Sequence, residues 1–124
     1  HYLTFEKDGK ALQHKGHKLS LTNACNDHDG KDMRFVLWWQ GKNPKDNAFY
    51  ISTADKHDRK YIASSLELTT KEKAAQFSIA DLGNGKGHVI TEIDSGKQLS
   101  VEKDGCVALT KNASDAFKVF SVTF

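Results

Sequence analysis

The segment Gly96-Lys97-Gln98-Leu99-Ser100-Val101-Glu102-Lys103-Asp104-Gly105 contains a short strand and the turn that ends it. Leu99, Ser100 and Val101 alternate apolar and polar side chains, as expected of a strand with one buried face. Asp104-Gly105 then supplies the residue types that tight turns between antiparallel strands favour. This part of the chain therefore predicts one strand of a hairpin.

Short strands of the same kind recur along the whole chain. Each is bounded by turn residues, of which Asp8-Gly9 and Ser95-Gly96 are examples. Only 70–75 has the composition of a helical turn. The predicted strands are 2–5, 18–21, 35–38, 49–51, 61–62, 66–68, 77–79, 89–93, 99–101, 107–109 and 117–120. We therefore predict an all-β fold.

Three phenylalanines divide the chain into similar parts. Phe35, Phe77 and Phe117 are spaced 42 and 40 residues apart. Each is followed two residues later by an aliphatic side chain, namely Leu37, Ile79 or Val119. A chain of 124 residues is too short for two separate cores. We predict a single domain built from three repeats of about four strands each, approximately 1–43, 44–84 and 85–124.

This pattern resembles a β-trefoil, and the resemblance covers the whole chain. It is closest to the fascin and hisactophilin branch, whose repeats run Gly-Lys-Tyr-Leu-Ser into a Lys-Asp-Gly-like turn. The segment 96–105 is similar to that motif, as is Arg59-Lys60-Tyr61-Ile62-Ala63-Ser64-Ser65. Lectin-like trefoils of the ricin type are less similar, because their repeats end in Gln-x-Trp and none of the three repeats of this chain does. The resemblance implies pseudo-threefold symmetry, with a barrel filled by apolar layers and capped by hairpins at one end.

The first repeat departs from the other two. If 16–20 is its second strand, its third strand falls within 24–32, which is polar and rich in turn residues. A departure from a pattern kept elsewhere in the chain marks a region where function is expected. The alternative is an ordinary surface loop with no binding role.

Trp39 is the residue that most favours ligand binding. In the threefold alignment it matches Asp81 and Ser121, so we expect its side chain to face solvent. An exposed indole can stack on the apolar face of a sugar or anchor a protein partner. Two alternatives remain: Trp39 packs under a neighbouring loop, or it contributes to a homodimer contact.

The favoured function is carbohydrate binding through shallow loop sites, as in lectin-like trefoils. Carboxylate, amide and imidazole groups would hold the hydroxyls of a glycan while an aromatic ring stacks beneath it. The third repeat offers only Asp94-Ser95-Gly96 and is the least favoured location. The candidate ligand-binding residues are Asp27, His28, Asp29 and Trp39 in the first repeat and Asp55, His57 and Asp58 in the second.

Charge and hydropathy argue against other partners. Eighteen Lys and Arg residues against sixteen Asp and Glu residues give a net charge of +2. A nucleic-acid binder would carry a basic stripe instead. No apolar run approaches the ~20 residues that a membrane helix needs. We therefore expect neither a nucleic-acid partner nor membrane insertion.

Two alternative functions follow from the resemblance. The fascin and hisactophilin branch implies a protein partner such as actin, which basic clusters at 7–10, 15–18 and 56–60 could face. Other trefoils inhibit proteases through an exposed loop, and the longest candidate loops here are 7–15 and 41–47.

Catalysis and cofactors are not expected. The chain has no Gly-x-Ser-x-Gly, His-Glu-x-x-His or phosphate-loop motif. The run Asp27-x-Asp29-Gly30-x-Asp32 resembles the start of a calcium loop, but Trp38 stands where the bidentate Glu is required. We expect Cys25 and Cys106 to be separate thiols, although a disulfide between trefoil hairpins is conceivable. Asn112 begins a glycosylation sequon, which matters only in a secreted eukaryotic protein.

Overall fold

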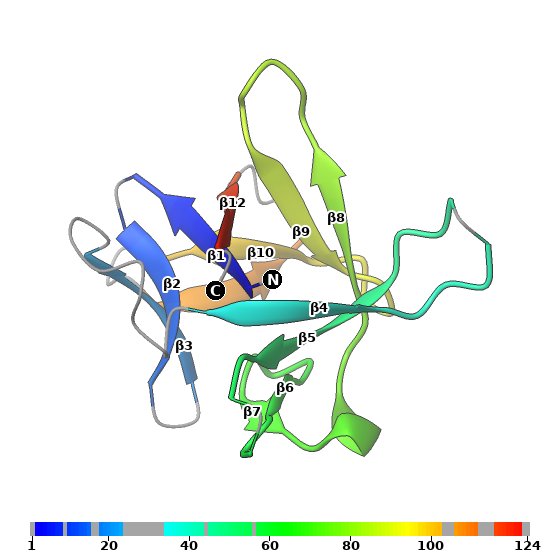
Figure 1. The fold of residues 1–124 in the computed structure, drawn as a ribbon. Helices are drawn as coiled ribbons and strands as arrows, with labels where there is room; N and C mark the ends of the chain where they lie inside the picture. Colours follow the sequence, from blue (N-terminus) through cyan, green and yellow to red (C-terminus); the bar gives the residue numbers. More distant parts are fainter. Residues whose placement is uncertain are drawn as a thin grey trace.

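The computed structural model of the chain describes residues 2–8, 10–15, 18–23, 34–43, 45–55, 57–102, 106–111 and 116–122. Within these residues the fold is all-β, as predicted, and the one helical element is the 3-10 turn η2, Lys71–Lys73. All pairs of strands are antiparallel and belong to one 12-stranded sheet. Figure 1 shows that the β8–β9 hairpin and the loop that follows β4 extend away from the rest of the sheet.

The strands are short and follow one another closely along the chain. Their bounds are β1 Tyr2–Lys7, β2 Lys10–Lys15, β3 Lys18–Asn23, β4 Phe35–Trp39, β5 Phe49–Thr53, β6 Tyr61–Ile62, β7 Leu68–Thr69, β8 Phe77–Asp81, β9 His88–Glu92, β10 Gln98–Val101, β11 Val107–Thr110 and β12 Lys118–Val122. Each of the eleven predicted strands has a counterpart in this series.

The strand that the sequence did not predict is β2. It pairs with β3 over its full length, with Leu12 opposite Leu21. Lys10–Lys15 is therefore the second strand of the chain and Lys18–Asn23 the third, so placing the second strand at 16–20 and the third within 24–32 was wrong. The physical reason is that Ala11 and Leu12 are consecutive and both buried, which removes the alternation expected of a strand. The segment 24–33 lies outside the described residues.

The pairing also removes one proposed protease-binding loop. Residues 10–15 form β2, and Lys7 pairs with Lys10 at the turn between β1 and β2. A substrate-like inhibitory loop must present an extended backbone that is free of sheet pairing. The described part of 7–15 is therefore a hairpin and not an extended loop.

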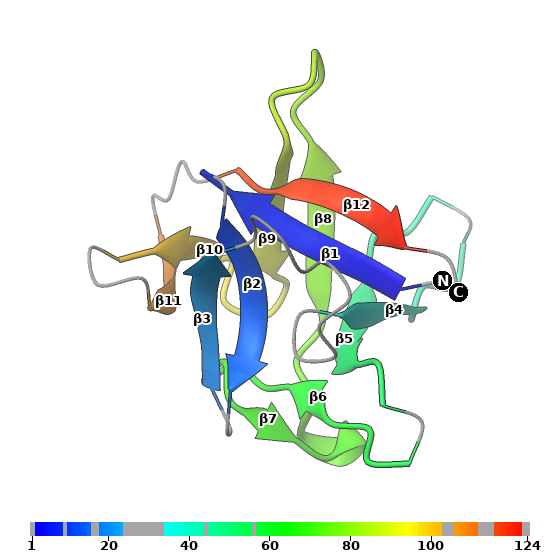
Figure 2. The same ribbon diagram turned by 60° about the vertical axis from the view of Figure 1, so that its left-hand side comes forward.

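Six of the strands are joined in a continuous series of pairings. β12 pairs with β1, β1 with β4, β4 with β5, β5 with β8, and β8 with β9. The two ends of this series meet at a bridge between His88 and Phe117, where two backbone hydrogen bonds measure 2.7 and 2.8 Å. The other six strands form the hairpins β2–β3, β6–β7 and β10–β11. Figure 2 shows β12 lying along β1.

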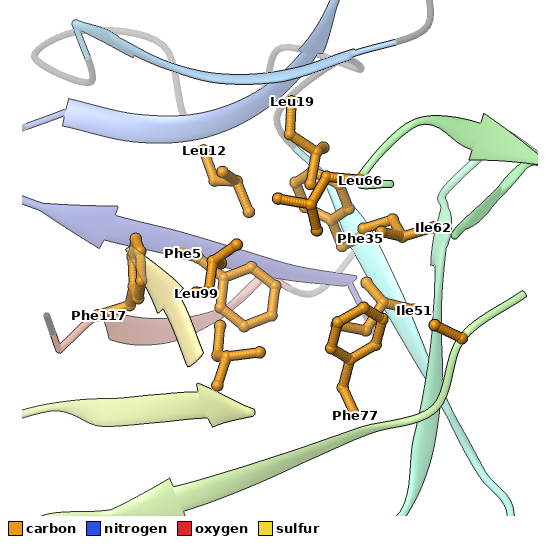
Figure 3. Close-up of a cluster of buried hydrophobic side chains, with 12 residues drawn as sticks. Phe5, Leu12, Leu19, Phe35, Ile51, Ile62, Leu66, Phe77, Leu99 and Phe117 are labelled. Atoms are coloured by element: carbon orange, nitrogen blue, oxygen red, sulfur yellow. The ribbon is translucent and has the colours of Figure 1, made fainter. Parts of the chain in front are cut away.

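The three phenylalanines that recur along the chain lie in the core. Phe35, Phe77 and Phe117 are at most 1% exposed, and Phe5 is fully buried beside Phe35 with 5.8 Å between ring centroids. The aliphatic residues two positions further along, Leu37, Ile79 and Val119, pack against the same cluster. Figure 3 shows how side chains from many strands converge there. Fully burying one such side chain is worth about 1.5–3 kcal/mol, so this cluster supplies much of the fold's stability.

The alternation of side chains along β4 sets up two different surfaces. Phe35, Leu37 and Trp39 share the face of the strand that leads to the core, whereas Trp38 lies on the opposite face. Cross-strand partners share a face, so Trp39 lies opposite Phe49 and Trp38 opposite Tyr50 on β5. The two consecutive tryptophans therefore have different surroundings.

Candidate ligand-binding site

Trp39 is the last residue of β4, and its side chain is 48% exposed. The predicted exposure is confirmed, but its origin differs from the one expected. Trp39 is on the core-directed face of the strand and is exposed because it stands at the strand end, beyond Leu37. Asp81 ends β8 in the same way and is exposed as well.

The loop that follows β4 holds the Trp39 indole in place. Nε1 of Trp39 donates a hydrogen bond of 2.9 Å to the main-chain oxygen of Asp46. Gly41 lies against the ring, since a Cβ placed on Gly41 would be 2.7 Å from Nε1. The ring thus packs on its own loop while half of its surface stays open to solvent, which gives it a fixed orientation.

Asp46 braces this loop through its side chain. Its Oδ2 accepts hydrogen bonds from the backbone N–H groups of Lys42 and Asn43, at 2.8 and 3.0 Å. These N–H groups favour the ionised carboxylate, with Asn43 contributing most, and they lower the pKa of Asp46 below its usual 3.8. A charged Asp46 at neutral pH therefore keeps the loop under Trp39 ordered.

Asn47 fixes the same loop to β8. Its Nδ2 donates to the main-chain oxygen of Ile79 at 2.6 Å, and its Oδ1 accepts from the N–H of Ile79 at 2.9 Å. At the base of the loop, the N–H of Gln40 donates to the oxygen of Ala48 at 2.7 Å. The loop is thus tied at its base and to the neighbouring strand.

Trp38 is built into a different environment. It is half-buried, and its Nε1 donates a 2.7 Å hydrogen bond to Oγ of the buried Ser52. The guanidinium of Arg59 lies 4.6 Å from the centre of the Trp38 ring, a cation–π arrangement. The rings of Tyr50 and Tyr61 meet edge to face, 6.1 Å apart. We name these four residues, Trp38, Tyr50, Arg59 and Tyr61, the Trp38 face.

The predicted loop of the second repeat leads directly into the Trp38 face. Asp55, His57 and Asp58 are all exposed. Oδ1 of Asp55 accepts the backbone N–H groups of His57 at 2.9 Å and of Asp58 at 3.3 Å, so this oxygen shapes the turn. Asp58 forms an ion pair of 3.5 Å with Lys60. The loop therefore lies next to Arg59, on the face of β4 that carries Trp38 and not on the face that carries Trp39.

The remaining predicted residues, Asp27, His28 and Asp29, lie outside the described residues, as does Cys25. Cys106 is exposed. From the sequence, 56–60 was expected to be a basic cluster, but the contact of Arg59 with Trp38 was not predicted. The signal for Trp38 was the alternation of β4 itself, because a buried Phe35 places residue 38 on the opposite face.

Among the described residues no group of three His, Cys, Asp or Glu side chains is arranged to hold a metal ion. Nor does any helix in the described segments have the length and apolarity needed to cross a membrane. Comparison of the chain with models of known protein families gives no match, and comparison with curated proteins gives none either.

Proposed function

We propose that this protein is a carbohydrate-binding module with the β-trefoil fold, and that a glycan binds against the exposed face of Trp39. The observation that carries the proposal is the immobilised indole: half exposed, bonded through Nε1 to the Asp46 carbonyl and backed by Gly41. The role proposed for the chain is binding and not catalysis.

The pairing of strands supports the trefoil part of this proposal. The series β1, β4, β5, β8, β9 and β12 returns on itself through the bridge at His88 and Phe117, as a six-stranded barrel would. The hairpins β2–β3, β6–β7 and β10–β11 then supply one cap element to each of the repeats 1–43, 44–84 and 85–124. A closed barrel leaves few free strand edges.

We call Trp39 and the loop residues that pack against it, Gly41 and Asp46, with their neighbours Lys42, Asn43 and Lys45, the Trp39 surface. Its chemistry suits a sugar ring. Because Nε1 is already bonded to Asp46, the indole offers its apolar face and not its N–H. A pyranose presents C–H groups on one face and hydroxyls at its rim. Lys42, Asn43 and Lys45 belong to the loop that packs against the indole, and their exposed polar side chains would be available to those hydroxyls. Fixing the ring before binding reduces the entropy lost on association.

A glycan array on the folded protein tests this proposal, with Trp39→Ala and Trp38→Phe as a matched pair. We expect the wild type and Trp38→Phe to bind the same glycans and Trp39→Ala to lose them, because the neighbouring substitution leaves the Trp39 surface intact. Unchanged binding by Trp39→Ala would place the glycan elsewhere. A blank array with a folded protein would reject carbohydrate binding at this surface.

A protein-binding function is the second candidate, and the Trp38 face favours it. Arg, Tyr and Trp are the residue types enriched at the energetic centres of protein interfaces. Arg59 and the exposed Lys71 and Lys73 would suit an acidic partner such as the actin filament that the family resemblance implies. Co-sedimentation with actin at ~0.15 M salt tests it, because weak charge attraction alone is largely screened there. Arg59→Ala should then reduce binding and Trp39→Ala should not.

A further inference from the structure

A pocket of about 360 Å³ lies between the turn of the β6–β7 hairpin, the turn that joins β9 to β10, and strand β11. Its polar wall contains Ser64, Ser65, Glu92, Ser95 and Lys97. None of these residues belongs to the Trp39 surface or to the Trp38 face. The volume falls within the range of small-molecule sites, roughly 300–1,000 Å³.

Glu92 is the unusual member of this wall. It is only 4% exposed, because it ends β9 in phase with the buried Ile90. Its Oε1 accepts a hydrogen bond of 2.5 Å from the hydroxyl of Ser95. Its Oε2 is buried and accepts no hydrogen bond from any residue that the structure describes. A buried carboxylate with an oxygen that has no donor is costly, so Glu92 favours a ligand whose hydroxyl reaches its carboxylate from the pocket.

The turn from β9 to β10 holds the Glu92 carboxylate in a fixed position. The N–H of Lys97 donates to Oγ of Ser95 at 3.2 Å, so the Ser95 hydroxyl proton is directed to Glu92. Within the same turn, the N–H of Gly96 donates to the main-chain oxygen of Glu92 at 2.9 Å. The N–H of Glu92 in turn donates to the oxygen of Lys97 at 2.8 Å. The polar wall is thus preorganised.

The other wall of the pocket is apolar. It is formed by Leu66, Val107 and Leu109, together with Ala108. Leu66 has a left-handed backbone with φ of 65°, a conformation that is unfavourable for a side chain of this size, yet it is only 6% exposed. Its side chain points into the core cluster, as Figure 3 shows, and this packing holds the turn in place.

We propose that this pocket binds a neutral polyhydroxylated ring of sugar size, with one hydroxyl donating to the carboxylate of Glu92. The carboxylate of Glu92 and the ammonium of Lys97 balance in charge, so the pocket suits a ligand without net charge. The hydroxyls of Ser64 and Ser65 can exchange hydrogen bonds with the polar rim of such a ring, while the apolar wall receives its C–H face. This site goes beyond the proposed function, because it shares no residue with the Trp39 surface.

Amide chemical shifts in a titration of the full chain test the pocket directly. The probes are glucose, galactose, mannose, myo-inositol and, as a charged comparison, ethanolammonium. We expect at least one neutral ring to shift the amides of 64–66, 92–97 and 107–109 while leaving those of 40–47 unchanged. The proposal is overturned if the neutral probes give no shifts there up to about 100 mM, an affinity of only ~1.4 kcal/mol. It is equally overturned if ethanolammonium alone binds.

Variants then assign the contact. Glu92→Gln should weaken the neutral ligand about tenfold or more, as expected from losing a hydrogen bond to a charged group. Glu102→Gln, at an exposed glutamate, is the matched control and should bind like the wild type. Lys97→Met serves as the second variant if Glu92→Gln does not fold, and it should also weaken binding. Wild-type affinity in a folded Glu92→Gln or Lys97→Met protein would overturn the proposal. Trp39→Ala should leave this pocket unaffected, so failure of one site is distinguishable from failure of the other.

Discussion

The strands β4, β8 and β12 carry the same residue type at one end and different residue types at the other. At the start of these strands, or just before it, stand Phe35, Phe77 and Phe117, which are identical and buried. Four residues later, the corresponding positions carry three different residues, Trp39, Asp81 and Ser121. The buried end is constrained by packing, because three equivalent positions must fill one interior. The far end is free of that constraint and can diverge for binding.

Removing a side chain from the repeated end should have the largest effect. We expect Phe77→Ala to lower the free energy of unfolding by about 3–5 kcal/mol, because it leaves a cavity in a closely packed cluster. Asp81→Ala, at the other end of the same strand, should change it by about 1 kcal/mol or less, because it removes only an exposed hydrogen bond of 2.8 Å from the N–H of Gly83. Urea denaturation of both variants measures the contrast. Equal effects would show that the two ends are not different in kind.

Gly41→Ala tests how tightly the Trp39 indole is held. A Cβ at this position would collide with the ring and with Asp46, so we expect a loss of about 1–3 kcal/mol and an altered Trp39 fluorescence. Gly85→Ala is the informative control, because its Cβ meets open space and only its positive φ of 71° is unfavourable. It should lower stability without changing the fluorescence of Trp39. If both variants leave the indole signal unchanged, the loop does not fix the ring.

The substitution Trp38→Phe tests whether Trp38, unlike Trp39, contributes to the stability of the fold. The substitution removes the hydrogen bond to Ser52, and we expect a loss of about 1 kcal/mol in thermal or urea unfolding. Ser52 still donates to the main-chain oxygen of Thr53 at 3.0 Å, which limits the cost. A stability equal to that of the wild type would mean that the Trp38 bond contributes nothing.

Protonation of Asp46 at low pH should loosen the loop that packs against Trp39. Of the effects predicted here, this one should change the global stability least. The pKa of Asp46 is lowered in the folded protein, so its contribution is fully present above the usual 3.8 and is lost as the pH falls through the lower folded value. In a Trp38→Phe background, fluorescence reports Trp39 alone, and we expect a transition with a midpoint below pH 3.8. Asp46→Ala should abolish that transition, whereas Asp58→Ala should retain it. A transition that survives Asp46→Ala would assign it to another group.

The strands that alternate apolar and polar residues were predictable from the sequence, and β2 was not. Consecutive Ala11 and Leu12 of β2 are both buried, so the period of two is absent. Because that strand was not predicted, the strand at 18–23 was counted as the second and not as the third in the proposed first repeat. The supposed departure at 24–32 was a consequence of this displacement and not an independent observation.

The exposure of Trp39 was predictable because its threefold counterparts are polar. The Glu92 pocket was overlooked, although 89–93 contained its signal: Glu92 stands two residues after Ile90, on the buried face of a strand. A charged residue in a core-directed position is informative because burying it requires a partner. The contact of Trp38 with Arg59 joins a strand residue to a loop residue 21 positions further along the chain, and no local pattern contains it.

Asn47 has a consequence for association between copies of the chain. Its amide mimics a peptide group and satisfies both the N–H and the oxygen of Ile79, at a point where β5 has not yet begun. Unpaired polar groups along a strand edge are templates on which strands of other molecules can add. One side chain in the Trp39 loop therefore closes the β8 edge at Ile79 to intermolecular β-pairing.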